Sequence, residues 1–207
     1  MKTTSGWLLY ALLGATLVLV GCPGPTSPPT RYFLLTAQTA LEPGTKPVEK
    51  PRTTNLVVEL EPVEIPQYLN RPEMVTRVGG NRLRLERLSQ WAGDLKEDLG
   101  RIAVENLSVL LGSDRITVLP NRAEQRADFR IATSINRFEP DENGLVTLDA
   151  RWTLFNGPGK LLTSRHARIA TQSAQSDDAE SLAEAMSQAM ARLHRDMATE
   201  ILNQPRQ

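Results

Sequence analysis

Alternating apolar and polar residues recur along most of the chain and predict strands at 31–36, 56–60, 74–78, 82–86, 116–119, 128–137, 145–156 and 161–171. The alternation is clearest in 145–156, where one face carries Val146, Leu148, Ala150, Trp152 and Leu154. Proline-bearing stretches at 40–53 and 65–72 predict a loop and an irregular crossing.

Two stretches with helical spacing predict helices at 94–111 and 178–202. Gly112 follows the first as a plausible C-terminal stop, and Asp177 with Glu180 predicts a cap for the second. The second helix carries an apolar stripe of Leu182, Met186, Ala189, Met190, Leu193, Met197 and Ile201. We interpret these methionines as core residues rather than as a binding groove.

The order of the elements is strands, helix, strands, helix, with turn sequences at 79–81, 141–144 and 156–159. The last three strands are therefore expected to form an antiparallel meander. The simplest arrangement is an α+β single domain with a largely antiparallel, twisted sheet and both main helices packed on one face. No internal repeat is present.

The first 21 residues have the pattern of a bacterial lipoprotein signal peptide. Lys2 gives a positive start, residues 7–20 are apolar but short for a membrane span, and Leu19-Val20-Gly21-Cys22 forms a lipobox. Cys22, the single cysteine of the chain, has no disulfide partner within it and is expected to carry the lipid. An ordinary signal peptide or a signal anchor is the alternative.

The residues after Cys22 predict where the lipid anchor resides. Residues 22–30 are rich in proline and form a lipidated, fairly stiff tether, and residues 31–207 form the folded domain. Because Pro23 replaces the aspartate that retains lipoproteins at the inner membrane, we expect the periplasmic face of the outer membrane.

Composition and motifs argue against several classes of function. The 24 basic and 24 acidic residues balance, and no basic and aromatic stripe suggests nucleic-acid binding. His166 and His194 lack ligand-spaced partners and are expected to be surface or half-buried residues, so no metal is predicted. No phosphate loop or nucleophile motif is present. We expect no catalysis and no cofactor.

Residues 65–95 resemble the PqiC/YmbA family of ABC-type transport auxiliary lipoproteins. The family carries the stretch P-x-Y-L-x-R-P-x-[IV]-V-x-R, then N-x-L, then W-A-x-x-L. The matching residues here are Pro66, Tyr68, Leu69, Arg71, Pro72, Val75, Arg77, Asn81, Leu83, Trp91, Ala92 and Leu95. The likeness extends over the domain but is specific between about 64 and 112.

The resemblance implies an α+β lipoprotein without catalysis of its own. Such proteins work at the outer membrane with an MCE-domain protein anchored in the inner membrane (PqiB-like), in a lipid transport path linked to envelope integrity, and they can assemble as homo-oligomeric rings.

Tyr68, Arg71, Arg77 and Trp91 are the candidate partner-binding residues, because aromatic and arginine side chains are enriched at interface centres. The alternative is structural, with the two arginines paired to internal carboxylates and Trp91 in the core. For the whole protein, the alternative is a stand-alone lipid or ligand carrier tethered to the outer membrane, with the apolar sheet face and the methionine-bearing helix lining a pocket.

Overall fold

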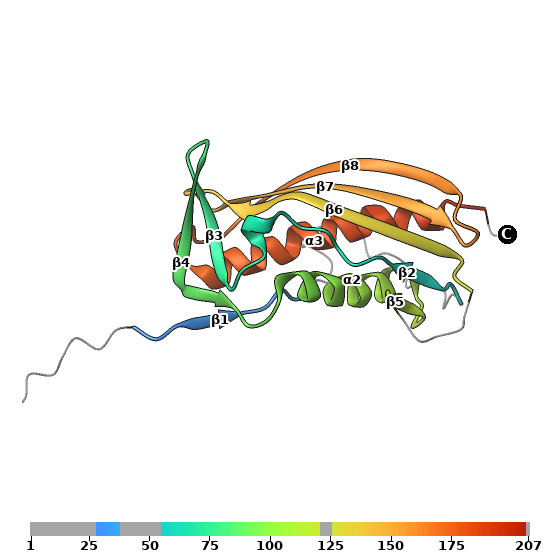
Figure 1. Ribbon diagram of the computed structural model, residues 1–207, viewed down its shortest axis with the longest axis horizontal. Coiled ribbons are helices and arrows are strands. Elements are labelled where there is room, and N and C mark those ends of the chain that lie inside the picture. Colours follow the sequence, from blue (N-terminus) through green and yellow to red (C-terminus); the bar gives the residue numbers. More distant parts are fainter. Residues whose placement is uncertain (1–27, 38–54, 121–125, 206–207) are drawn as a thin grey trace, which may run out of the picture.

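The computed structural model describes residues 28–37, 55–120 and 126–205, and the strands among them form two sheets (Figure 1). The first sheet has the order β1-β4-β3 and consists of β1 (Arg31–Phe33), β4 (Arg82–Trp91) and β3 (Glu73–Val78). The second has the order β5-β2-β6-β7-β8 and consists of β5 (Ile116–Val118), β2 (Val58–Leu60), β6 (Phe129–Pro140), β7 (Leu145–Asn156) and β8 (Leu161–Gln172).

The strand pairing confirms the expected antiparallel units and adds parallel ones. The β3–β4 hairpin and the β6-β7-β8 meander are antiparallel. However, β1 runs parallel to β4, and β2 lies parallel to both β5 and β6. The strands therefore divide between two mixed sheets instead of forming one. The α+β, single-domain class is confirmed.

The two main helices begin and end where local capping chemistry allows. The Asp94 side chain accepts backbone hydrogen bonds at the start of α2 (Leu95–Leu111), and Gly112 ends it with a φ of 62°. At the start of α3 (Ala179–Leu202), Asp178 Oδ2 accepts from the backbone N–H of Ser181 at 2.9 Å. The expected cap at Asp177 is thus wrong by one residue, because the aspartate in register with the first helical turn is the second of the pair.

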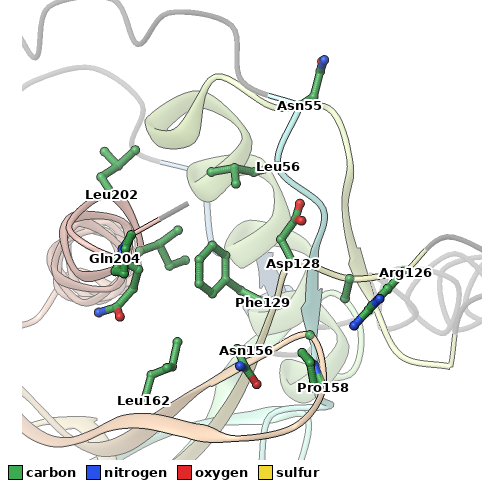
Figure 2. A pocket seen from close by; sticks show the side chains of 14 residues that line it. Asn55, Leu56, Arg126, Asp128, Phe129, Asn156, Pro158, Leu162, Leu202 and Gln204 are labelled. Atoms are coloured by element: carbon green, nitrogen blue, oxygen red, sulfur yellow. The ribbon is translucent and has the colours of Figure 1, made fainter. Parts of the chain in front are cut away.

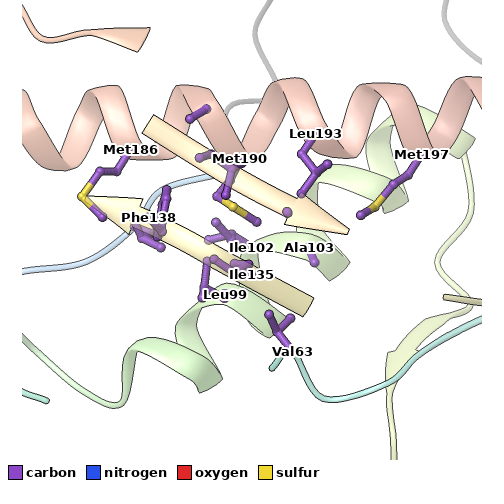
Figure 3. Packing of buried hydrophobic residues seen from close by; sticks show 14 of the residues in the cluster. Val63, Leu99, Ile102, Ala103, Ile135, Phe138, Met186, Met190, Leu193 and Met197 are labelled. Atoms are coloured by element: carbon purple, nitrogen blue, oxygen red, sulfur yellow. The ribbon is translucent and has the colours of Figure 1, made fainter. Parts of the chain in front are cut away.

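The core lies between the five-stranded sheet and the two helices, which both pack on one face of that sheet (Figures 1 and 3). Figure 3 shows the α3 side chains Met190 and Leu193 above Ile102 of α2 and Ile135 of β6. All the stripe residues of α3 are buried, so the methionines are core residues, as expected. None of the three methionines of this stripe, Met186, Met190 and Met197, is among the residues that line the pocket at the end of the domain described below.

The segment after β1 is hydrogen-bonded to both main helices. The backbone N–H of Leu35 donates to Asp98 Oδ2 of α2 at 2.7 Å, and that of Thr36 donates to Ser187 Oγ of α3 at 3.0 Å. Arg101 also donates to the Leu35 carbonyl oxygen. The point at which the chain enters the domain is therefore fixed relative to the core, although Cys22 itself lies outside the described residues.

His194 is fully buried between α2 and α3, contrary to the expectation of a surface or half-buried residue. Its Nδ1 lies 3.0 Å from Asn106 Nδ2, and because the amide nitrogen donates, the imidazole accepts and is neutral. Burial lowers the pKa of His194 to about 3. The sequence predicted that His194 lies in a helix, but not that its side chain is buried. One polar residue beside an apolar stripe does not show how wide the buried face of the helix is.

This buried histidine predicts a loss of stability on mild acidification. Between its ordinary pKa of 6.5 and about 3, the unfolded chain binds a proton that the folded protein does not, so the free energy of unfolding falls as the pH falls. At pH 5.5 the loss due to His194 is expected to be about 1.3 kcal/mol relative to pH 7. Urea unfolding of the wild type and of His194→Gln at both pH values tests this.

The Gln variant should show a smaller difference between the two pH values by about that amount. His166→Gln is the matched control, because the side chain of His166 is about half exposed and bonds Asp149 on the sheet surface. An unchanged pH dependence in His194→Gln would contradict the prediction.

Candidate functional site: the Glu139 network and the end pocket

The motif that carries the family resemblance begins in the crossing between β2 and β3. Pro66, with an extended ψ of 145°, precedes the short 3-10 helix η2 (Gln67–Leu69), whose turn is closed by the Leu69 N–H bonding the Pro66 carbonyl at 3.0 Å. The chain then enters β3. This path brings Tyr68 of η2 and Arg77 of β3 to the same carboxylate on β6.

That carboxylate belongs to Glu139, whose side chain is 0% exposed. Glu139 Oε1 accepts from Arg77 Nε at 2.6 Å and from Arg137 Nε at 2.9 Å. Glu139 Oε2 accepts from the Tyr68 hydroxyl at 2.8 Å and from the Phe138 backbone N–H at 3.1 Å. Four donors thus surround one buried anion, which satisfies the requirement that a buried charge be paired and hydrogen-bonded.

The network joins the two sheets, because Arg77 belongs to the three-stranded sheet and Glu139 to the five-stranded one. A register shift in β6 between Ile135 and Arg137 accompanies this arrangement, and an isolated bridge pairs Arg77 with Asp141 just beyond β6. We call Tyr68, Arg77, Arg137 and Glu139 the Glu139 network.

The electrostatics of the network keep Tyr68 protonated and Arg77 charged. Burial, followed by the hydrogen bond to Glu139, raises the pKa of Tyr68 to about 12. The hydrogen bond to Glu139 raises the pKa of Arg77 as well. At neutral pH the phenol is therefore a hydrogen-bond donor and not a base, and the arrangement holds structure instead of performing acid–base chemistry.

The other two candidate residues lie outside this network. Trp91, at the end of β4, is buried in the core, and its backbone N–H donates to the Pro72 carbonyl at 2.7 Å. Arg71 is half-buried, and its Nε is buried without a hydrogen-bond partner in the described structure. The structural alternative thus agrees with the positions of Arg77 and Trp91, whereas no carboxylate pairs with Arg71 among the ion pairs of the described residues.

Sequence reasoning did not select Glu139 or Arg137. We expected the strand to end at Arg137, although it continues to Pro140. The available signal was an acidic residue beside Phe138 within a strand-like stretch, which is unusual unless the charge is paired. Its partners are 62 and 71 residues away along the chain, so the local pattern could not reveal them.

A pocket of about 580 Å³ lies where the β7–β8 turn, the start of β6 and the end of α3 meet. Figure 2 shows Phe129 among the apolar side chains Leu56 and Leu162, with Asp128 and Asn156 nearby. In Figure 1 the C-terminal end of α3 and the β7–β8 turn lie at one end of the molecule, and β1 lies toward the other.

No cluster of three or more His, Cys, Asp or Glu residues that could hold a metal ion occurs in residues 28–37, 55–120 and 126–205. Over the same residues, no helix has the length and apolar character needed to cross a bilayer.

Comparison with known families identifies the family to which the chain belongs. Residues 39–198 match the family described as the ABC-type transport auxiliary lipoprotein component. The chain belongs to this family, which confirms the PqiC/YmbA-type resemblance. The family is one of transport auxiliary lipoproteins, and membership indicates a membrane-anchored location in the cell envelope.

Solved structures support the fold. A crystal structure of an uncharacterized protein superposes with a TM-score of 0.67 at 19% identity, covering 84% of this chain and 99% of that chain. Protein XCC0632 from Xanthomonas campestris superposes with a TM-score of 0.67 at 16% identity, covering 84% of this chain and 95% of that chain. No curated protein matches the sequence.

The network predicts that Glu139→Gln destabilises the domain strongly. The change leaves two guanidinium groups beside a neutral amide, and breaking a buried ion pair from one side costs about 3–5 kcal/mol. Tyr68→Phe removes a single hydrogen bond to the charged carboxylate and should cost about 1.5–3 kcal/mol. Both values can be measured as the free energy of unfolding in urea.

Glu86→Gln is the matched control for this prediction. Glu86 also pairs with an arginine, Arg84, but that pair lies on the exposed side of β4 and should contribute no more than about 1 kcal/mol. If Glu139→Gln and Glu86→Gln lower the free energy of unfolding equally, the Glu139 network does not hold the two sheets together.

Proposed function

We propose that this protein is a non-enzymatic outer-membrane lipoprotein subunit of an MCE-type intermembrane lipid transport system. In this role it docks the periplasm-spanning conduit of an inner-membrane-anchored, PqiB-like MCE protein and supports envelope integrity. The observation that carries the proposal is family membership over residues 39–198, together with the lipobox that ends at Cys22.

The anchor and the fold support a docking role. Acylation of Cys22 would hold the domain at the bilayer, and Pro23 in place of aspartate favours the outer membrane. The Glu139 network uses its polar groups inside the protein and offers no nucleophile, base or metal ligand to a substrate. A rigid domain of this kind contributes through its surfaces, and we expect several copies to surround one conduit as a ring.

The matched segment remains our candidate partner-binding surface. Tyr68, Arg77 and Trp91 shape this surface from inside. Arg71 is the candidate that is half-buried and makes no ion pair among the described residues, so the accessible part of its guanidinium can pair with a partner carbonyl or carboxylate. The adjacent Gln67 and Asn70 are exposed and can contribute polar contacts at its rim.

Crosslinking in intact envelopes followed by affinity purification tests the proposed function. We expect the full-length lipoprotein to recover an MCE-domain protein, with more than one lipoprotein copy per complex, and mass spectrometry identifies both. Recovery of the lipoprotein without any MCE protein in crosslinked cells would overturn the docking role.

Arg71→Gln separates partner binding from folding. Because Arg71 makes no ion pair within the described residues, the free energy of unfolding should change little, whereas recovery of the MCE protein should fall several-fold. Arg151→Gln, on the exposed face of β7, is the matched control and should leave recovery unchanged. Equal recovery with both variants would remove Arg71 from the interface.

The end pocket supports a second candidate function, that of a stand-alone lipid or ligand carrier. Its volume of about 580 Å³ and its apolar residues Leu56, Phe129 and Leu162 suit part of an acyl chain. The carrier hypothesis predicts that the detergent-extracted protein retains phospholipid in native mass spectrometry. Leu162→Trp should fill the pocket and abolish retention, whereas Leu161→Trp, at the neighbouring exposed position, should not.

A further inference from the structure

Three large apolar side chains near the start of the domain are exposed to solvent. They are Tyr32 and Leu34, which are 64% and 52% exposed, and Leu88 of β4, which is 44% exposed. We call these three residues the β1 patch. Neither the core nor the Glu139 network uses them, so their exposure needs another explanation.

The pairing of β1 with β4 places Tyr32 and Leu88 on neighbouring strands, and Leu34 follows immediately after the paired residues. Tyr32 lies opposite Gln90, which is two residues after Leu88 on the same strand. Leu34 lies two residues after Tyr32, so its side chain points to the same, outward side. The next residue, Leu35, is completely buried. Leu34 also lines a shallow hollow with Val109 at the end of α2.

Leu88 reaches the surface because β4 is irregular at this point. Glu73 pairs with Gln90 while the next residue, Met74, pairs with Glu86, so β4 contains extra residues between these positions. Such a bulge redirects side chains and bends the strand. The bulge is thus the structural feature that adds a third apolar residue to the two supplied by β1.

The β1 patch is flanked by one arginine on β1 and one on β4, and Leu34 also lies beside Arg101 and Glu105 of α2. Arg31 precedes Tyr32, and Arg87 precedes Leu88 and is exposed. Arg31 keeps a long, 3.6 Å ion pair with Asp178 and lies over the Phe33 ring, so its side chain is still half exposed. Ser89 and Gln90 of β4, which pair with Arg31 and Tyr32 of β1, are uncharged. An aromatic and aliphatic surface with flanking arginines suits the interfacial layer of a phospholipid bilayer.

The short stretch of chain between Cys22 and the β1 patch identifies the phospholipid bilayer as the surface that the patch contacts. Arg31 follows Cys22 by nine residues, which span at most about 30 Å when fully extended. α3 alone has 24 residues and is about 36 Å long, and the β7–β8 turn lies at the far end of the molecule (Figure 1). The tether needs the least extension when the anchored domain is oriented with β1 toward the bilayer.

We propose that the β1 patch is a second membrane contact, in which Tyr32, Leu34 and Leu88 enter the interfacial layer of the phospholipid bilayer that holds the lipid anchor. This inference rests on the lipid-anchored part of the proposed function and not on the MCE partner. The contact fixes the orientation of the domain, because the anchor alone restricts only its distance from the bilayer. The end pocket then faces away from the membrane.

A second copy of the chain is the competing occupant, and the geometry of β1 disfavours it. As an edge strand β1 is only three residues long, which offers few backbone groups for pairing with another strand. Leu34 borders the shallow hollow beside Val109, whereas Tyr32 and Leu88 line neither that hollow nor the end pocket. A surface of this kind can enter lipid without a complementary protein shape.

A single-thiol labelling experiment tests the proposal. Acylation consumes the Cys22 thiol, so Leu88→Cys in the full-length lipoprotein carries the one free thiol of the protein and can be labelled with an environment-sensitive nitrobenzoxadiazole dye. The labelled protein is reconstituted into vesicles of phosphatidylethanolamine and phosphatidylglycerol, with or without headgroup-proximal spin-labelled lipid. The matched control is Leu161→Cys, because Leu161 is an exposed leucine (55%) at the far end of the molecule.

We expect dye at position 88 to show a blue-shifted emission and quenching by the spin-labelled lipid, and dye at position 161 to show neither. Adding Tyr32→Ser and Leu34→Ser to Leu88→Cys should abolish the quenching while the protein remains anchored. If dye at position 88 is unquenched in anchored protein, the proposal is overturned. A blue shift that is independent of the quencher and lost on dilution shows a contact between copies, which also overturns it.

The anchor is measured separately by vesicle flotation and by the mass of the peptide that contains Cys22. Protein that floats with acylated Cys22 but gives no quenching at position 88 disproves only the β1 patch contact. Absence of the acylated peptide disproves the lipid anchor, and the proposed contact is overturned with it. Failure to recover an MCE protein leaves the anchor and the quenching result standing.

Discussion

The buried carboxylate of Glu139 is the interaction on which the arrangement of the two sheets depends. An anion that is inaccessible to solvent must be neutralised and hydrogen-bonded at close range, and Glu139 obtains its donors from η2, β3 and β6 itself. These donors hold the three-stranded sheet at a defined position on the five-stranded one. The three-stranded sheet that is held in this way also contains β1, where the chain enters the domain, and the buried Trp91 at the end of β4.

This network changes the interpretation of the motif shared with the family. Tyr, Arg and Trp are enriched at interface centres, which made Tyr68, Arg77 and Trp91 candidate binding residues. In the folded domain the same side chains hold internal structure, and each loses exposure in doing so. The motif therefore indicates first how the domain is built, and a partner can engage it only through the parts that remain accessible, such as Arg71 and its exposed neighbours.

The molecule is also organised along its length. The chain enters at β1, where apolar and basic side chains are exposed, and the pocket lined by Phe129 lies toward the opposite end. α3 runs between the two ends as a single continuous helix of 24 residues, and its buried stripe makes the whole length one rigid core. An anchored lipoprotein with such a shape can present one end to the bilayer and the other to the periplasm.

The sequence by itself determined the elements with strong local patterns. The alternation in 145–156, the turn sequences between the last three strands and the stripes of both helices predicted the meander, α2 and α3, because side-chain periodicity is a local property. The family motif and the lipobox were likewise contained in contiguous residues. Sequence alone also gave the correct class of fold.

Only the tertiary structure decided which elements pair and which polar groups are buried. β2 is three residues long and lies between β5 and β6, strands that the chain reaches only after α2. His194 and Asn106 are 88 residues apart, and the donors to Glu139 are drawn from positions up to 71 residues away. Which distant segments pair depends on how all surfaces of the folded chain compete for contacts. Hydrophobic periodicity shows which face of an element a residue lies on, but not which residue it contacts.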